Sequence, residues 1–321
     1  MPSSVRADAI ATQEIHPPAM SDTLLPTWHQ PIMMDEVRRY LNPRPGRTLI
    51  DGTVGTGGHS QALLPRLLPN GRLIAIDRDR ESLERATQRL IEFESVLSTV
   101  HGNFRDLPQI LHRLEVPAVD GILLDLGMSS AQVDEAARGF SFLKDGPLDM
   151  RMDETQELSA HTLVNTLSVS ELAALLERFG EERFAKRIAQ HIVHARRTHP
   201  ITTTHQLARV ITEALPFGAR HGRVHAATRT FQALRMVVND ELGALEACMD
   251  HLTHLLRPKG RAVILTFHSL EDRLVKHRFV QGMREGNWIV LTKKPVCASE
   301  AEVAQNPRAR SAKLRAIERC A

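Results

Sequence analysis

The sequence predicts an α/β fold, in which a doubly wound, Rossmann-like sheet is interrupted by an inserted all-helical domain. Three observations predict it: strand-length apolar runs alternate with helical patterns over residues 48–126, the pattern is helical from 134 to 256, and strand-like runs return at 261–267 and 287–292. We therefore expect residues 28–133 and 236–321 to form the sheet domain and residues 134–235 to form the insertion.

The first predicted strand leads into the densest group of glycines. An apolar run ends at Asp51, a turn that contains Gly57 and Gly58 follows, and a helical pattern opens at Ser60. Strand, glycine-rich turn and helix is the arrangement with which doubly wound sheets bind an adenosine-containing cofactor. An ordinary βα turn is the alternative interpretation of this signal when it stands alone.

The second predicted strand, 72–77, ends in Asp77, twenty positions after Gly57, where a carboxylate can accept hydrogen bonds from both hydroxyls of a ribose. Ser60 stands where the dinucleotide pattern G-x-G-x-x-G requires its third glycine. The spacing instead resembles the D-x-G-x-G-x-G loop of class I S-adenosylmethionine methyltransferases, with Thr53 in the place of the first glycine. A methyltransferase is therefore favoured over a nucleotide-dependent oxidoreductase.

The third and fourth strands are expected at 99–104 and 121–126 and end near Phe104 and Asp125. Ligands of open α/β sheets lie beyond the carboxyl ends of the strands, so these two residues should converge there with Asp51 and Asp77.

A carboxylate at Asp125 suits methylation of an exocyclic amine, because an acceptor bonded to the N–H group can localise the nitrogen lone pair. The N/D-P-P-Y/F signature of DNA amino-methyltransferases is absent here, and a turn acceptor or helix N-cap is the alternative for Asp125. Methylation at cytosine C5 is disfavoured because no cysteine has a supporting motif.

The predicted insertion has a strong charge asymmetry. Residues 134–182 contain 11 acidic and 4 basic residues, whereas residues 183–235 contain 10 basic residues, one acidic residue and six histidines. The basic block favours a polyanionic partner such as nucleic acid, and a solvated face balanced by the acidic block is the alternative. Phe140 and Phe142 could stack an extruded base or equally belong to the core of the insertion.

A long helix over Phe231–Leu256 is expected to return the chain to the sheet, and Pro258–Gly260 is expected to turn it into the fifth strand. His268 follows that strand at the same rim, where a lone histidine is more often structural than catalytic. A last strand is expected at 313–318, and residues 293–321 carry 7 basic and 3 acidic residues, which suits phosphate contacts.

The composition bounds the class of protein. Apolar residues make up 42% and charged residues 25% of the 321 residues, as in soluble globular proteins. No apolar run approaches the roughly 20 residues of a membrane helix, so no membrane partner is expected. Residues 1–27 are interpreted as a disordered tail without a signal-peptide core. Cys248, Cys297 and Cys320 lack paired or metal-type spacing, which favours a reduced, cytoplasmic setting and no metal.

The motifs occur together in one order over about residues 28 to 319. They are His29–Met33, Asp51–Ser60, Ile76–Asp79, Gly102–Phe104, Asp125–Gln132, Arg138–Phe142, Leu148–Asp153, Thr228–Arg235 and Phe267–Arg273. In this combination the chain resembles the bacterial MraW family of small-subunit ribosomal RNA cytosine-N4-methyltransferases. The resemblance implies a class I methyltransferase domain with a helical insertion, S-adenosylmethionine as cofactor, and the decoding region of 16S rRNA in the small ribosomal subunit as partner.

By the same resemblance, the cofactor contacts fall on Gly57, Gly58, His59, Asp77, Phe104, Asp125 and Gln132. Asp77 would hold the ribose, Phe104 would cover the adenine and Asp125 would lie nearest the methyl group and orient the amine. The departures from the family are small: Met128 replaces a smaller aliphatic residue and Ala131 replaces a common proline. The sequence leaves open an RNA-binding factor without turnover, the cytidine that is modified, naked RNA or assembled subunit as substrate, and the oligomeric state, with a homodimer as one alternative.

Overall fold

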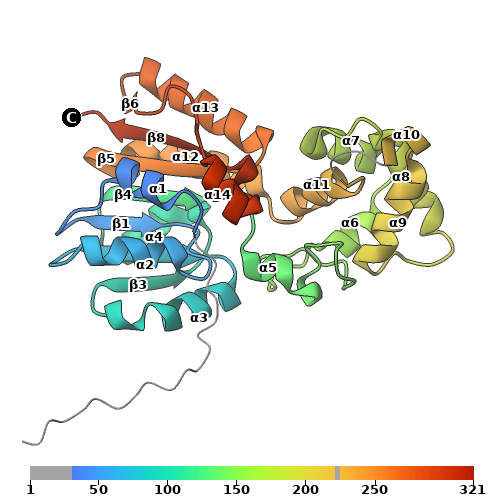
Figure 1. The fold of residues 1–321 in the computed structure, drawn as a ribbon, viewed down its shortest axis with the longest axis horizontal. Coiled ribbons are helices and arrows are strands. Elements are labelled where there is room, and N and C mark those ends of the chain that lie inside the picture. Colours follow the sequence, from blue (N-terminus) through green and yellow to red (C-terminus); the bar gives the residue numbers. More distant parts are fainter. Residues whose placement is uncertain (1–30, 221–224) are drawn as a thin grey trace, which may run out of the picture.

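The computed structural model describes residues 31–220 and 225–321, and Figure 1 shows two parts side by side. One part is a sheet with helices on both faces, and the other is built from the helices α6 to α11. The expected disordered tail at residues 1–27 lies outside the described residues. Within the described ranges, no helix is long and apolar enough to cross a membrane.

Within the described residues, eight strands form one sheet in the order β3-β2-β1-β4-β5-β8-β6, with β7 paired to β8. Strands β1 to β5 are parallel, whereas β8 is antiparallel to β5, β6 and β7. The order reverses between β1 and β4, which is where open α/β sheets bind their ligands. The expected doubly wound, Rossmann-like sheet is confirmed. The bounds are β1 Thr48–Asp51, β2 Arg72–Asp77, β3 Leu97–His101, β4 Val119–Asp125, β5 Leu256–Thr266, β6 Trp288–Val290, β7 Val296–Cys297 and β8 Lys313–Arg319.

Helices cover both faces of this sheet. One face carries α1 Met34–Leu41, α2 Gly58–Leu63 and α3 Arg80–Arg89, and the other carries α4 Leu107–Arg113, α12 Glu241–Leu255 and α13 Ser269–Arg284. In β4, Leu123 packs on the first face, whereas Ile122 and Leu124 pack on the second. Successive strand side chains point to opposite faces, and both faces are buried, so the strands have continuous apolar sequences. Short 3₁₀ turns lie at η1 Leu64–Arg66, η2 Ile91–Phe93 and η3 Phe104–Asp106.

The return from the insertion differs from the expected single helix. Two helices, α11 Thr228–Val238 and α12, are separated at Asn239 and Asp240, where Asp240 has a φ of 43°. The buried Asn239 side chain donates to the Met150 carbonyl at 2.7 Å and accepts the Met152 N–H at 2.8 Å. The prediction of one helix over 231–256 is wrong. These hydrogen bonds to residues far away in the sequence stabilise a break at Asn239, and the apolar pattern continues through the break without interruption.

The start of the fifth strand also differs from expectation. Strand β5 begins directly after α12. Leu256 pairs with Val119 and Arg261 pairs with Gly121, so a longer stretch of β5 lies opposite a shorter stretch of β4. Lys259 adopts a φ of 63° within this stretch. The segment 258–260 is therefore a bulge inside β5 and not a turn before it.

The insertion has its own apolar core, which extends from Phe140 to Val238 and is distinct from the clusters on the sheet. The helical spacing of Leu172, Leu175 and Leu176 is confirmed, since all three are buried on α7. The elements between β4 and α12 are α5 Ser130–Asp134, η4 Ala136–Arg138, α6 Ala160–Thr166, α7 Val169–Gly180, α8 Ala185–Ala195, α9 Thr204–Ala214, α10 Phe217–Arg220 and α11.

The C-terminal segment places α14 Glu300–Gln305 and η5 Pro307–Ser311 beside α5, at the junction of the two parts (Figure 1). Arg308 donates hydrogen bonds to Ser130 and Asp134, both on α5. The strands expected at 287–292 and 313–318 are confirmed as β6 and β8. The short strand β7 was not expected, because two residues carry no periodic signal.

Candidate active site

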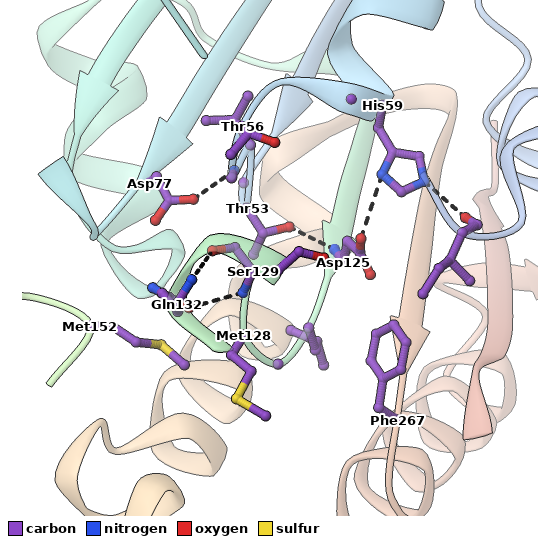
Figure 2. A pocket seen from close by; sticks show the side chains of 18 of the residues that line it. Thr53, Thr56, His59, Asp77, Asp125, Met128, Ser129, Gln132, Met152 and Phe267 are labelled. Carbon is purple, nitrogen blue, oxygen red and sulfur yellow. Dashed lines mark hydrogen bonds and ion pairs between the residues drawn. The ribbon is translucent and has the colours of Figure 1, made fainter. Parts of the chain in front are cut away.

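A cavity of about 480 Å³ lies at the carboxyl ends of the parallel strands, as Figure 2 shows. Its walls come from the segments after β1, β2, β3, β4 and β5, from Arg235 and Glu241 at the break between α11 and α12, and from the C-terminal segment. Of the residues expected from the sequence, Gly58, His59, Asp77, Phe104, Asp125 and Gln132 line the cavity, whereas Gly57, Phe140, Phe142 and His268 do not.

The glycine loop fits closely against the strand next to it. A Cβ atom at Gly52 would lie 2.6 Å from Leu124 Cδ2 and 3.3 Å from Phe104 Cβ, so a side chain here would force these two neighbours to shift. Gly57 has a φ of 85° and packs toward Ala86 on α3, away from the cavity. The loop therefore offers the cavity backbone atoms, while Gly57 sets its turn.

Asp77 ends β2 and is held in place by the backbone. Its carboxylate accepts the N–H of Gly55 at 2.8 Å and the N–H of Asp79 at 2.9 Å. Burial raises the pKa of Asp77 to about 6, against the lowering effect of these two hydrogen bonds. The carboxylate is thus fixed on the loop side of the cavity and can accept further donors from a ligand.

Asp125 ends β4 at the centre of the cavity. Its backbone N–H donates to Thr53 Oγ1 at 2.6 Å, which ties the end of β4 to the glycine loop. The carboxyl Oδ1 is buried without a hydrogen-bond partner among the described residues. Burial, followed by the charge of Glu271, raises the pKa of Asp125 to about 7. The Asp125 side chain is 25% exposed and lines the cavity, so its carboxyl group can accept a donor from a ligand.

His59 and Asp51 are buried neighbours of Asp125. His59 Nδ1 is 3.5 Å from Asp125 Oδ2, and its Nε2 is 3.0 Å from the Ile32 carbonyl oxygen (Figure 2). Asp51 does not reach the cavity, although we expected it to converge there with the other strand ends. It is buried and accepts the Ser60 hydroxyl at 2.7 Å, so its role is to hold the first turn of α2.

Gln132 supports the Asp77 side of the cavity from α5. Its Nε2 donates to Asp79 Oδ2 at 2.7 Å, and its Oε1 accepts the Ser129 N–H at 2.9 Å in a capping box. Because Asp79 N–H also donates to Asp77, Gln132 is two bonds away from that carboxylate. Its side chain is therefore a brace between the loop after β4 and the loop after β2.

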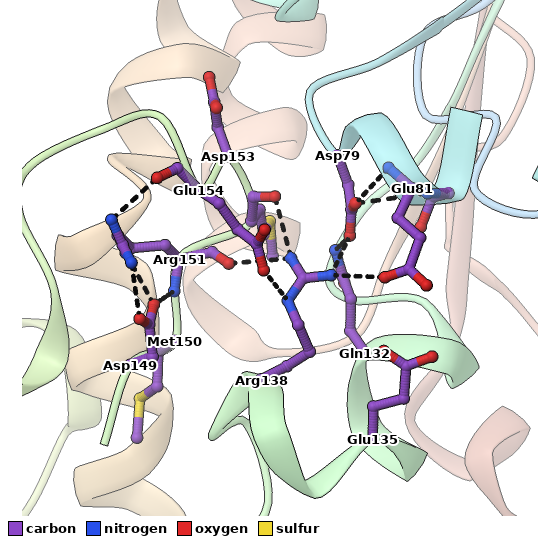
Figure 3. Close-up of polar contacts among 12 residues, drawn as sticks. Asp79, Glu81, Gln132, Glu135, Arg138, Asp149, Met150, Arg151, Asp153 and Glu154 are labelled. Carbon is purple, nitrogen blue, oxygen red and sulfur yellow. Dashed lines mark hydrogen bonds and ion pairs between the residues drawn. The ribbon is translucent and has the colours of Figure 1, made fainter. Parts of the chain in front are cut away.

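Arg138 is the buried centre of the junction between the two parts, and Figure 3 shows its contacts. The guanidinium donates to Asp79 Oδ2 at 3.0 Å and to the carbonyl oxygens of Arg151 and Met152, both at 3.1 Å. Glu154 lies at 3.3 Å, and the Arg138 side chain is only 7% exposed. The motif around Arg138 was visible in the sequence, but its partner Asp79 was not, because 59 positions separate them.

Arg235, Glu241 and Glu271 line the cavity on the side of the insertion and were not expected there. Arg235 donates from Nε and one terminal nitrogen to the two oxygens of Glu241, each at 2.8 Å. This pair bridges the break between α11 and α12, and a six-residue spacing across a break gives no helical signal.

His268 caps α13 and does not line the cavity. Its Nδ1 accepts the Glu271 N–H at 3.3 Å, and its Nε2 lies 3.2 Å from Glu271 Oε1. Glu241, His268 and Glu271 could offer ligand atoms within 4.8 Å of one another. Arg235 already occupies Glu241, so we assign no metal to this group. The structural role that the sequence favoured for His268 agrees with these contacts.

The two phenylalanines after the site belong to the insertion core. Phe140 is 6% exposed, so its ring has no free face for a base, which corrects the stacking role expected for it. Phe142 stacks on His225 with ring centroids 4.5 Å apart and meets Phe231 edge-on at 5.0 Å. The sequence left core packing open for this pair, and the structure places both side chains there.

The basic part of the insertion is exposed. Its exposed cations include five on or next to α8 and α9, which are Arg183, Lys186, Arg187, Arg197 and Arg209. In the described part of the chain none of these five forms an ion pair, so the acidic block does not neutralise them. Unpaired, exposed cations on adjacent helices form a positive surface, to which a polyanion is attracted.

Comparisons with known proteins show what this chain is similar to. The model of the MraW methylase family matches residues 26–320. The "Ribosomal RNA small subunit methyltransferase H" of Geobacter sulfurreducens is 49% identical over 306 residues, covering 91% of this chain and 98% of that protein. The protein of the same name from Syntrophotalea carbinolica is 47% identical over the same shares. The crystal structure of TrmN from Thermus thermophilus has a TM-score of 0.42 at 13% identity, covering 89% of this chain and 48% of that one.

Proposed function

This chain belongs to the MraW methylase family, and from that premise we propose that it methylates the exocyclic N4 amine of a cytidine in the decoding region of 16S rRNA. S-adenosylmethionine is the methyl donor, transfer is direct and in line, and the location is cytoplasmic. The observation that carries the proposal is Asp125, a carboxyl group that ends β4 and lines the cavity with its side chain 25% exposed.

The residues of the cavity fit this cofactor. Asp77 offers two carboxylate oxygens for ribose hydroxyls, and the backbone of the glycine loop, including Gly58, lies open to the ligand. Phe104 presents an apolar wall for the adenine. The volume of about 480 Å³ lies within the usual range for cofactor pockets. When bound, S-adenosylmethionine supplies an activated methyl group on a sulfonium centre.

The cofactor residues implied by the family act in two ways in this proposal. His59, Asp77, Phe104 and Asp125 contact the ligand directly, together with Gly58. Gly57 acts through the turn that it makes possible, and Gln132 through its hydrogen bond to Asp79. Both kinds of residue are needed, because a carboxylate positions a ribose only if its own loop is held rigid.

Asp125 is proposed to act on the amine. The N4 nitrogen of cytosine is a weak nucleophile, because its lone pair is delocalised into the ring. A carboxylate that accepts one N–H hydrogen bond localises that lone pair and orients it for attack. The partly exposed side chain of Asp125 and its position in the cavity wall support this role.

The RNA would lie across the insertion and the C-terminal segment. The five exposed cations on and next to α8 and α9 are suited to phosphate contacts, since each neutralised phosphate releases counterions. Arg308 lines the cavity and holds the C-terminal segment against α5, so that segment borders the path by which a base enters. A base must leave its stack to reach Asp125.

The test supplies the protein with isotopically labelled S-adenosylmethionine and small ribosomal subunits from cells that lack the endogenous enzyme. The RNA is then digested to nucleosides. Naked 16S rRNA forms a parallel arm that identifies the substrate form, and Asp125→Ala is the inactive control. We expect labelled N4-methylcytidine from one arm. Label in another nucleoside would overturn the N4 assignment, and cofactor binding without label in either arm would favour a binding factor without turnover.

A further inference from the structure

His59 makes two contacts that together fix where its protons lie. Its Nε2 is 3.0 Å from the carbonyl oxygen of Ile32, which can only accept a hydrogen bond. Nε2 therefore carries a hydrogen whether the ring is neutral or charged. In the neutral ring Nδ1 is then a bare lone pair, and this lone pair is the atom that faces Asp125.

The contact between His59 and Asp125 is stable only with a proton in it. Nδ1 lies 3.5 Å from Asp125 Oδ2. A lone pair and an ionised carboxylate repel each other at this distance, whereas one proton between them makes the contact attractive. Burial raises the pKa of Asp125 and lowers the pKa of His59, so both groups are drawn toward their neutral forms. When both groups are neutral, one proton lies between the Asp125 carboxyl group and His59 Nδ1.

The surroundings reinforce this proton count. The other charged groups that act on the pair are Asp51 from β1, Glu302 from α14 and Glu271 from α13, and all three are acids. Asp51 is engaged by Ser60, and Glu302 accepts the Met33 N–H at 2.7 Å. An excess of negative charge beside the pair favours retention of its proton.

We propose that His59 and Asp125 share one proton and act as a single acid–base unit on the acceptor amine, an inference that rests on the proposed function. The amine nitrogen forms a bond to the methyl carbon, and the bond from that carbon to its leaving group breaks, with the electron pair leaving on that group. The proton that the nitrogen loses passes to Asp125 Oδ2 and becomes the shared proton with His59. Release of this proton to water resets the pair.

The rate of methyl transfer should depend on pH. The pair must be free of its shared proton before it can take one from the amine, so the rate of transfer rises with pH as the pair deprotonates. Proton uptake also relieves the repulsion between the Nδ1 lone pair and the carboxylate, which makes the proton-free pair a stronger base than an isolated carboxylate. One pH unit below the midpoint, the rate should fall about tenfold.

The first test observes the proton in the protein alone. The full chain is labelled with ¹⁵N and ¹³C in its histidines, and imidazole spectra are recorded from pH 5 to 9, with His59→Gln used to assign the signals. We expect a ring with hydrogen on Nε2 and one titration step, which disappears in Asp125→Asn because an amide N–H donates to Nδ1 at every pH. Hydrogen on Nδ1 of the neutral ring, or an unchanged titration in Asp125→Asn, would overturn the proposal.

The second test compares two substitutions in single-turnover transfer at saturating cofactor. His59→Asn places an amide N–H near the position of Nδ1, which donates to Asp125 but accepts no proton. His59→Gln can still reach Ile32 but leaves Asp125 without that partner. We expect the wild-type midpoint to match the spectroscopic one, and His59→Asn to move the rising limb at least one unit lower.

A pH profile of His59→Asn that coincides with the wild type would refute the base role. Absence of labelled N4-methylcytidine from every protein would refute the proposed function instead, while the spectroscopic titration still decides whether the proton is shared.

Discussion

Replacing Arg138 with methionine should destabilise the junction between the two parts of the molecule. The substitution keeps the apolar stem of the side chain and removes the guanidinium, which is 7% exposed and bonded to Asp79 at 3.0 Å. Asp79 then loses its only buried cation among the described residues, and the carbonyl oxygens of Arg151 and Met152 lose their donor.

The expected loss in the free energy of unfolding depends on the hydrogen bonds that Asp79 keeps in the variant. Breaking a buried ion pair by removing one partner costs about 3–5 kcal/mol. Asp79 keeps the amide of Gln132 and the backbone N–H groups of Glu81 and Ser82, which places the loss near the lower end. With an m-value of about 3 kcal/mol/M, the urea midpoint should fall by about 1 M.

The assay is equilibrium urea unfolding of the full chain, with Arg85→Met as the matched control. Arg85 also bridges the two parts, through Glu81 and Glu135, but its side chain is 35% exposed. Exposed pairs of this kind contribute about 0.2–1 kcal/mol each, so the loss of both should shift the midpoint of the control by less than about 0.7 M. Equal shifts for the two variants would refute the reasoning, because burial is the property that separates them.

Three further outcomes are expected. Asp77→Asn should weaken S-adenosylmethionine binding in calorimetry by about 10- to 100-fold, which is what the loss of hydrogen bonds to a charged acceptor costs. Because burial raises the pKa of Asp77 to about 6, the affinity of the wild type should also fall from pH 7 to pH 5. An affinity that does not change with pH would argue against binding by the Asp77 carboxylate. Asp125→Asn should raise the melting temperature of the cofactor-free protein at pH 8. The pKa of Asp125 is about 7 in the folded state and about 4 in the unfolded state, so the ionised carboxylate destabilises the folded state at pH 8. A lower melting temperature of the variant would contradict this. Lys186→Glu with Arg187→Glu should reduce the slope of log RNA affinity against log salt concentration by about 0.7 per lost phosphate contact, whereas Glu177→Gln on α7 should leave the slope unchanged. An unchanged slope in the double variant would exclude RNA binding by this face of α8.

The edge of the sheet that holds the cavity could be predicted because its signals are local. An apolar run that ends in a carboxylate marks both β2 and β4, and parallel strands bring such ends to the same edge. Asp77 and Asp125 were therefore placed from the strand pattern alone. Asp51 shows the limit of that rule, since a strand end beneath the first turn of a helix is covered by that turn.

Other parts were missed because their causes lie far apart in the chain. The break at Asn239 depends on Met150 and Met152, and the burial of Phe140 depends on the helices that close around it. Apolar periodicity is unchanged through the break, so no reading of residues 231–256 by themselves could locate it. The bulge in β5 likewise becomes visible only through its register against β4.

By itself the sequence determined the alternation of strands and helices, the glycine loop, the helical character of the insertion and the family, since each depends on residues that are near one another or on a fixed order of motifs. Only the tertiary structure decided that Arg138 meets Asp79 across 59 positions and that His59 turns its Nδ1 toward Asp125. The physical reason is that local preferences are summed along the chain, whereas the partner of a buried charge is chosen by which groups the folded backbone brings within hydrogen-bond distance.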